Sequence, residues 1–281
     1  MILLDCRKIT SIFVSILFLS LMVSAETIAI NEKGYFEKQG LNVMVLNDIY
    51  PEGHQGGIAI IQHGRRVTNN GNLSLQPTPG QWQPYPKLLE KKLDRENNII
   101  TARLMFPDSS RINTHEQPVI YPDFEFEYVI RTIGERDGIR IIVDLEEPLP
   151  ENWVGKVGFN MELYPEFLFG RSYLMDDMAG IFPNYPNSPV YQDDDGEYEA
   201  VPMAKGQSLT IAPDDPMLKM TINSKNNHLK LIDGRVKHNN GWFVVRSLIP
   251  GGAAKNAIEW KIIPNIIDNW TYQPVIHMNQ V

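Results

Sequence analysis

The chain of 281 residues is 43% hydrophobic and 21% charged, an ordinary composition for a globular protein with a sizeable core. Its formal net charge of -8 at pH 7 argues against a nucleic-acid partner, because phosphate binding needs a basic surface. A neutral partner such as a polysaccharide is compatible with that charge.

The first 25 residues have the pattern of a cleaved signal peptide. Arg7 and Lys8 precede an apolar stretch over 9–23, and residues 23–25 read Val-Ser-Ala, with small residues where a signal peptidase cuts. The stretch is too short and too rich in serine to favour a spanning helix. Cleavage would remove Cys6, which is the one cysteine, so the mature chain would have no disulfide. The sequence therefore predicts a secreted, periplasmic or cell-surface protein with no membrane association after cleavage.

Short strand-like segments dominate the rest of the chain, and no window has a capped helical stripe. In 123–133, Phe124, Phe126, Tyr128 and Ile130 alternate with polar or smaller residues, which is typical of a strand with one buried face. The expected strands are 41–46, 58–62, 65–68, 73–76, 87–94, 98–105, 123–133, 139–145, 154–163, 209–212, 219–222, 229–232, 241–248 and 257–263. The pattern predicts an all-β protein, an antiparallel β-sandwich that could be a large supersandwich like galactose mutarotase.

Turn signals set the expected hairpins. His63-Gly64 predicts a turn before 65–68, and 136–138, which reads Arg-Asp-Gly, predicts the link between 123–133 and 139–145. The sequence 69–71, which reads Asn-Asn-Gly, predicts a further tight hairpin, because Asn-Gly readily supplies the positive φ of such a turn.

The last eleven residues suggest a domain boundary. Pro274 precedes Val275, Ile276 and Met278, a run of strand formers in which the chain stops. One interpretation is a short edge strand that docks on the preceding domain. The other divides the chain into a sandwich over 26–270 and, over 271–281, a linker with the truncated first strand of a following domain.

An aromatic, proline-rich and acidic stretch over 166–207 interrupts the strand pattern. It contains Tyr173, Asp176 and Asp177, and its aromatic content argues against disorder. Irregular segments of this length in compact domains tend to be functional. A cover that seals one end of the sandwich and a binding surface are equally good interpretations.

Aromatic side chains in polar loops are candidates for sugar binding, since the apolar faces of sugar rings stack on them. Trp82 and Tyr85 lie in the polar, proline-rich loop 79–86. Trp153 and Trp242 are further candidates, although a tryptophan in a strand more often packs in a core. The candidate carbohydrate-binding residues are Trp82, Tyr85, Tyr173, Asp176, Asp177 and Trp242.

The acidic turn 193–197 resembles a calcium loop, because clustered carboxylates with a glycine turn suit a hard cation. Its candidate ligands are Asp193, Asp195 and Glu197. A solvated acidic turn is the alternative, since Tyr191 stands where the first aspartate of an EF-hand loop should be. No other cofactor is expected, and no two histidines have the spacing of metal ligands.

Catalytic motifs are weak in this sequence, which has no phosphate-binding glycine loop and no nucleophile elbow. Glu162, Glu166, Asp176 and Asp177 could supply an acid and a base for sugar chemistry. Carboxylates are too common for that pattern to identify a reaction.

A family resemblance adds to this interpretation. Met278-Asn279-Gln280-Val281 resembles the first strand of the immunoglobulin-like domain that precedes the catalytic domain in family 9 glycoside hydrolases, the cellulase-type enzymes. The stretches 53–57, 77–84, 233–235 and 238–242 resemble an N-terminal module found upstream of such enzymes in Bacteroidetes. The family's catalytic residues belong to a helical barrel that this sequence does not contain, so none is carried over.

Two hypotheses remain open. The resemblance implies a non-catalytic carbohydrate-associated module of a secreted glycoside hydrolase acting on β-glucan of the cellulose type. Its partners would be a polysaccharide or the immunoglobulin-like and catalytic domains of the parent enzyme. The alternative is a stand-alone sugar-active enzyme that uses carboxylates within 162–197.

Overall fold

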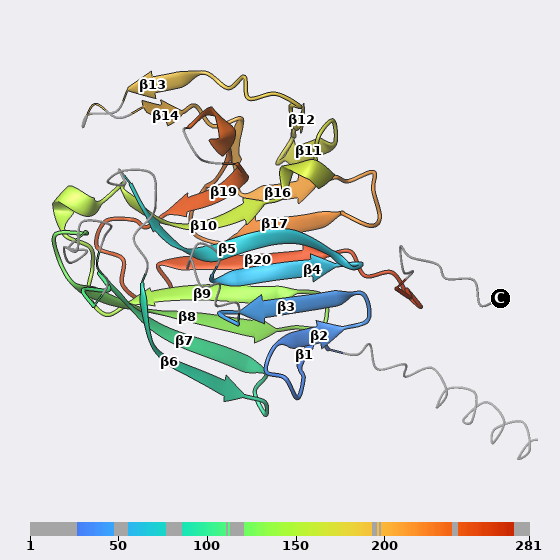
Figure 1. Ribbon diagram of the computed structural model, residues 1–281, viewed down its shortest axis with the longest axis horizontal. Helices are drawn as coiled ribbons and strands as arrows, with labels where there is room; N and C mark the ends of the chain where they lie inside the picture. The colour runs from blue at the N-terminus through green and yellow to red at the C-terminus, as the bar shows by residue number, and fades with distance from the viewer. Residues whose placement is uncertain are drawn as a thin grey trace, which may run out of the picture.

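The computed structural model describes residues 27–47, 56–76, 86–110, 112, 121–192, 196, 198–237 and 241–272. Within these ranges the protein is an antiparallel β-sandwich of two nine-stranded sheets with one additional two-stranded sheet (Figure 1). The all-β antiparallel sandwich predicted from the sequence is confirmed. The finer likeness to galactose mutarotase stays a prediction. The helices of the described ranges are too short to cross a bilayer.

The first large sheet, called sheet 1, joins the amino-terminal strands to strands from the second half of the chain. Its spatial order is β1 (Ala29–Ile30), β2 (Phe36–Lys38), β3 (Leu41–Val45), β4 (Ile58–Gln62), β5 (Arg65–Leu75), β10 (Val157–Leu163), β19 (Phe243–Leu248), β18 (Leu229–Asp233) and β15 (Ala204–Gly206).

The second large sheet, called sheet 2, has the order β12 (Met178–Ile181), β11 (Ser172–Met175), β16 (Ser208–Ile211), β17 (Met220–Ser224), β20 (Ile258–Pro264), β9 (Ile139–Leu145), β8 (Phe126–Gly134), β7 (Ile99–Phe106) and β6 (Lys87–Asp94). Strands β13 (Val190–Gln192) and β14 (Tyr198–Ala200) pair with each other. Three 3-10 helices, η1 (Glu151–Trp153), η2 (Pro165–Phe167) and η3 (Gly234–Val236), complete the elements of the described ranges.

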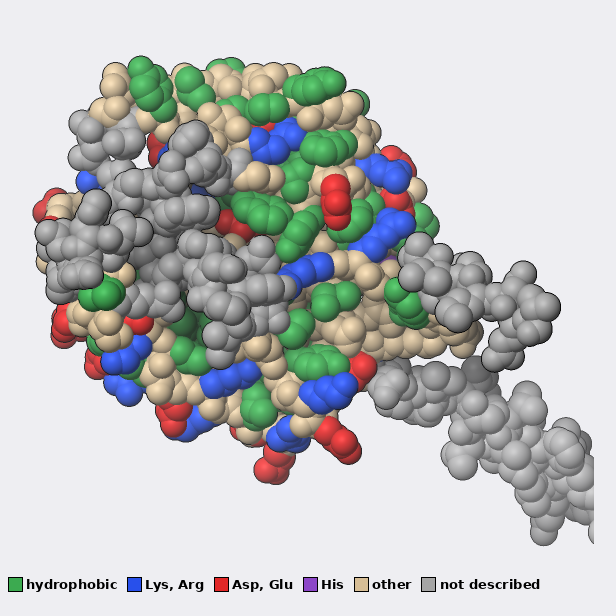
Figure 2. Space-filling model, in the orientation of Figure 1, with side chains coloured by type: hydrophobic (Ala, Val, Ile, Leu, Met, Phe, Trp, Pro, Cys, Tyr) green, Lys and Arg blue, Asp and Glu red, His purple; other side chains and the backbone are tan. Residues whose placement is uncertain are grey.

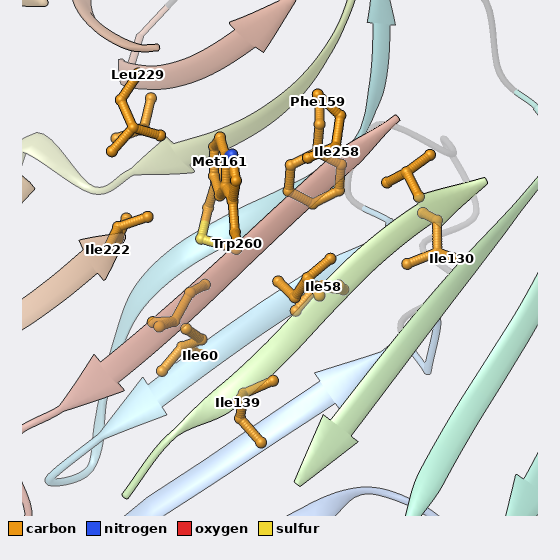
Figure 3. Close-up of a cluster of buried hydrophobic side chains, with 14 of the residues drawn as sticks. Ile58, Ile60, Ile130, Ile139, Phe159, Met161, Ile222, Leu229, Ile258 and Trp260 are labelled. Atoms are coloured by element: carbon orange, nitrogen blue, oxygen red, sulfur yellow. The ribbon is translucent and has the colours of Figure 1, made fainter. Parts of the chain in front are cut away.

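The core lies between the two large sheets, where alternate residues of each strand point inward. Figure 3 shows Phe159 and Met161 of β10 facing Ile258 and Trp260 of β20. The ring of Trp260 meets that of Phe159 edge to face, with 4.9 Å between centroids. Trp260 is completely buried, and its indole Nε1 donates a hydrogen bond to Ser247 Oγ at 3.0 Å. This bond pairs the polar atom of the largest core side chain, as burial in an apolar interior requires.

Strand β8 confirms the alternation read from the sequence. Tyr128 and Ile130 are buried, whereas Val129 and Arg131 are partly exposed. The hairpin between β8 and β9 turns at 135–138, where the Glu135 backbone N–H donates to the Gly138 carbonyl.

The predicted hairpin at Asn69-Asn70-Gly71 is wrong, because β5 runs without a break from Arg65 to Leu75. The chain reverses earlier, at His63-Gly64, where φ is 49° and 75°. At 69–71 the pairing register with β10 shifts, so the segment is a β-bulge. Asn70 has φ 50°. The sequence therefore correctly indicated positive φ at this position, but the residue belongs to a β-bulge and not to a hairpin turn.

The aromatic stretch over 166–207 contains short strands at the rims of the sandwich, not one irregular loop. Strands β11 and β12 extend sheet 2, and β15 extends sheet 1. Arg235 binds this stretch to sheet 1, because its guanidinium donates to the carbonyls of Pro183 and Asn184 while it forms a bidentate pair with the buried Asp233. The sheet edge and the covering segment are therefore one packed structure.

Several predicted features lie outside the described residues. They are the signal peptide over 1–25, the loop 79–85, the candidate calcium ligands and the terminal strand after Tyr272. These stay predictions.

Candidate functional site

Of the carbohydrate-binding residues predicted from the sequence, the structure describes Tyr173, Asp176, Asp177 and Trp242. Trp82 and Tyr85 lie outside the described residues, as do Asp193, Asp195 and Glu197 of the candidate calcium loop. Within the described ranges no group of three or more His, Cys, Asp or Glu side chains could hold a metal ion.

Tyr173, Asp176 and Asp177 share the β11–β12 hairpin at the edge of sheet 2. Tyr173 is buried against Phe182, with ring centroids 5.2 Å apart, and burial raises the pKa of its hydroxyl. Asp176 accepts hydrogen bonds from the backbone N–H groups of Gln207 and Ser208, so its carboxylate holds the hairpin to the following turn. Asp177 is exposed. Tyr173 and Asp176 therefore have packing and positioning roles in this structure.

The two strand-associated tryptophans pack against other aromatic rings. Trp242 is half-buried and meets Tyr164 edge to face at 4.7 Å. Trp153 is buried, and its indole Nε1 donates to Asp123 Oδ1 at 2.8 Å. Burial therefore excludes Trp153 as an open platform, whereas Trp242 keeps part of its surface exposed.

An open groove of about 620 Å³ lies at the end of sheet 1 where the amino-terminal strands turn. Trp270 and Tyr272 form an aromatic wall, with ring centroids 6.4 Å apart and planes at 68°. Polar groups come from Asn31, Glu37, Lys38, Gln39 and Asn42. This combination of aromatic surface with a few placed polar groups, in this range of volume, is typical of small-ligand sites.

Glycines at two turns allow the aromatic wall to approach the sheet. At Gly64, φ is 75° and a Cβ atom would lie 3.1 Å from the Tyr272 ring. Gly40 has φ 74° and borders both Trp270 and His63. The Trp270 carbonyl accepts a hydrogen bond from Gln39 Nε2 at 2.8 Å, which ties the wall to the β2–β3 turn. The Gln39 side chain thus holds Trp270 at the turn, while Tyr272 keeps 64% of its surface exposed.

Behind the wall, His63 packs at a ring-centroid distance of 5.6 Å from Trp270. Its Nδ1 is 3.0 Å from the Met217 carbonyl oxygen, which can only accept, so Nδ1 donates. This contact fixes the ring that supports Trp270 from the protein side.

A mostly buried carboxyl group, that of Glu162, forms a second polar site on the outer face of β10. Glu162 Oε2 accepts a hydrogen bond from Asn70 Nδ2 at 2.6 Å, across the bulge of β5. Burial raises the pKa of Glu162 to about 7, although the hydrogen bond from Asn70 acts in the opposite direction. A carboxyl group with such a pKa can both hold and release a proton near neutrality.

The four carboxylates considered for acid and base catalysis are held by different neighbours. Glu162 binds Asn70 of sheet 1, whereas Asp176 binds the turn before β16 in sheet 2. Glu166 is an exposed residue of η2, and Asp177 is exposed at the β11–β12 turn. No hydrogen bond among the described residues joins any two of these four.

Comparison with known proteins gives no family. No family model matches the chain, and no curated protein matches it. Among solved structures, the Slr1438 protein from Synechocystis sp. PCC 6803 is similar over 82% of this chain and 95% of its own, at 11% sequence identity and a TM-score of 0.41. Similarity at that level supports no statement about function.

Trp270 and Tyr272 were not among the site residues predicted from the sequence. They stand only two positions apart in a polar stretch, which is the same pattern that selected Trp82 and Tyr85. Their polar partners in the groove come from 31–42, more than two hundred positions earlier, so local sequence patterns could not join them.

Proposed function

We propose that this chain is a non-catalytic, carbohydrate-binding β-sandwich module of a secreted glycoside hydrolase that acts on β-glucan of the cellulose type. The observation that carries the proposal is the aromatic wall of Trp270 and Tyr272 above a groove with amide and charged groups. A sugar ring offers an apolar face for stacking and hydroxyl groups for hydrogen bonds, and this groove supplies a partner for each.

The parent enzyme enters the proposal through the resemblance to family 9 glycoside hydrolases. In such an enzyme the module would bind the polysaccharide, or brace the immunoglobulin-like and catalytic domains, after export through the signal peptide. An uncharged glucan also agrees with a chain whose net charge is -8.

Binding to cello-oligosaccharides and to soluble mixed-linkage β-glucan tests the proposal, by calorimetry and by affinity electrophoresis of the mature chain. We expect Tyr272→Ala and Trp270→Ala each to weaken binding about tenfold, equivalent to about 1.4 kcal/mol. Tyr185→Ala is the matched control, because Tyr185 is 80% exposed and lies outside the groove.

Using both Trp270→Ala and Tyr272→Ala separates a loss of binding from a loss of folding. Trp270 packs on His63, so its loss can loosen the fold, whereas Tyr272 is 64% exposed and its loss removes mainly surface. Absence of saturable binding by the wild-type chain, or equal binding by Tyr272→Ala and the wild type, would refute this groove as the sugar site.

One observation favours a second candidate, a stand-alone sugar-active enzyme. The pKa of Glu162, raised to about 7 by burial, suits a general acid or base. That hypothesis predicts release of reducing ends from β-glucan by the purified chain, lost in Glu162→Gln. We expect no release of reducing ends. Its detection would refute the non-catalytic module and support the stand-alone enzyme.

A further inference from the structure

Three basic side chains form a row across three neighbouring strands of sheet 1. Lys205 of β15 lies directly opposite Lys230 of β18, and Lys230 lies directly opposite Arg246 of β19. Residues so paired point to the same face, with Cβ atoms about 4.5–5.5 Å apart, and like charges in such positions repel. We call Lys205, Lys230 and Arg246 the basic row.

The row is a local concentration of positive charge in an acidic protein. In Figure 2, Lys and Arg side chains are spread among hydrophobic and acidic ones and form no large basic field on the visible face. Burial, with repulsion from Lys205 and Arg246, lowers the pKa of Lys230. Burial also lowers the pKa of Arg246, to about 10, against the attraction of Glu199 and Tyr191.

Within the part of the chain that the structure describes, one carboxylate acts on the row. Glu199 of β14 is a carboxylate that attracts both Lys230 and Arg246, but its Oε1 already accepts a hydrogen bond from Lys237 at 2.5 Å. Lys205 and Lys230 have no ion-pair partner within the described ranges. Among the described residues, three basic side chains thus face one carboxylate, and that carboxylate is already paired with Lys237.

Arg246 also has an unused hydrogen-bond donor. Its side chain is 3% exposed, and Nη2 donates to the Lys156 carbonyl at 2.8 Å, but the buried Nη1 has no partner among the described residues. Asn160, directly opposite Arg246 on β10, has a buried Oδ1 that is likewise unpaired there. A buried polar group left unpaired lowers stability, and the loss is greater when the group is charged. A ligand with both an acceptor and a donor could satisfy the two atoms together.

Aromatic surface lies beside the row. The β13–β14 hairpin lies at the top of Figure 1, above β19 in that view, and its Tyr191 is 49% exposed. Tyr191 is close enough to Arg246 to act on its charge. An aromatic side chain therefore belongs to the electrostatic surroundings of Arg246.

We propose that the basic row is a binding site for an acidic saccharide, in which a carboxylate or sulfate group of the sugar binds the row and a ring hydroxyl donates to Asn160. Arginine and lysine are the usual partners of such oxyanions. The site lies on β15, β18 and β19, apart from the groove of Trp270 and Tyr272 on β1–β3. It extends the ligand range beyond the neutral glucan of the proposed function and stands independently of it.

Titration of the mature chain with four probes, followed by calorimetry and NMR, tests the proposal. The probes are D-glucuronate, D-glucose 6-sulfate, D-glucose and acetate. We expect at least one acidic sugar to bind about tenfold more tightly than both glucose and acetate, and the tighter acidic sugar identifies the oxyanion. If acetate binds as tightly as the acidic sugars, the ligand is not a saccharide. If glucose binds as tightly as the acidic sugars, the charge of the ligand has no role. If no probe shows saturable binding, the proposed site is refuted.

Variants locate the binding. Lys230→Gln and Lys205→Gln should each weaken binding of the acidic sugar about three- to tenfold, about 0.7–1.4 kcal/mol, and its dependence on salt should decrease. Lys87→Gln, an exposed lysine of β6 in sheet 2, is the matched control. Tyr272→Ala should leave this binding unchanged, so failure here and failure of the glucan groove are distinguishable. Unchanged affinity in both row variants would refute the assignment.

Discussion

Glu162 lets the pH dependence of folding stability be derived from one side chain. Its carboxyl group lies on the outer face of β10, where Asn70 donates a hydrogen bond to it, and burial raises its pKa from 4.5 to about 7. Glutamine has nearly the same shape and its Oε1 can still accept from Asn70, but it does not ionise. The substitution Glu162→Gln therefore removes the titration and keeps the contact.

The sign follows from proton binding in the two states. Below pH 4.5 the carboxyl is protonated in both the folded and the unfolded chain, and it contributes no pH dependence. Between pH 4.5 and about 7 the unfolded chain loses this proton while the folded chain keeps it, so the free energy of unfolding falls as pH rises. Above about pH 7 the folded carboxyl ionises too, and the loss reaches a plateau.

The size of the loss follows from the same two pKa values. The difference between 4.5 and about 7, at 1.36 kcal/mol per unit of pKa, gives about 3 kcal/mol. Glu162 keeps some solvent-exposed area, which lowers the cost of the charge, so we expect about 2 kcal/mol.

Urea unfolding from pH 4 to 8.5 measures the effect. The free energy of unfolding of Glu162→Gln, minus that of the wild type, should increase by about 2 kcal/mol between pH 4.5 and 8. Glu166→Gln removes an exposed carboxyl four positions along the chain and should show no such increase. A difference for Glu162→Gln that stays constant with pH would refute the reasoning.

Three further substitutions test the fold and the groove by urea unfolding. Trp260→Ala, which empties a completely buried position, should lower the free energy of unfolding by about 3–5 kcal/mol; a loss below about 1 kcal/mol would contradict the packed core. Asp233→Ala leaves the Arg235 guanidinium without its buried partner and should cost about 3–5 kcal/mol; a neutral effect would contradict the buried pair. Gly64→Ala places a Cβ atom at φ 75° and against the Tyr272 ring, so it should lower the free energy of unfolding by about 1–2 kcal/mol and weaken glucan binding. Unchanged glucan binding would contradict the position of Tyr272 at the edge of the binding groove.

Local sequence patterns predicted most of the longer strands, because a strand with one buried face leaves its period in the sequence, but not the short strands β1, β2 and β11 to β15. Strands β6 and β9 have the bounds expected for 87–94 and 139–145. The expected strand 154–163 begins late, at Val157, because Trp153 ends the 3-10 helix η1 and Gly155 has φ 86°. The apolar residues around Gly155 indicate a strand, but the positive φ of Gly155 makes a turn before the strand begins.

The groove and the basic row could not be found in this way, because both depend on pairing between distant segments. Gln39 donates to the carbonyl of Trp270, 231 positions later. Lys205, Lys230 and Arg246 become neighbours only through the register of β15, β18 and β19. Nothing in the local pattern of any one strand reports that register, which is set by the two packed sheets together.

The bulge in β5 shows how a misread motif and a candidate site are connected. Asn69 pairs with Glu162 and Asn72 pairs with Asn160, so β5 has one residue more than β10 between the two pairs. Asn70 takes positive φ at this place, and its amide donates to the Glu162 carboxyl. A regular strand at 69–71 would not need positive φ and would place the amide of Asn70 differently relative to Glu162. The Asn-Gly signal therefore marks the position where the backbone bends to bring a donor to a buried carboxyl group.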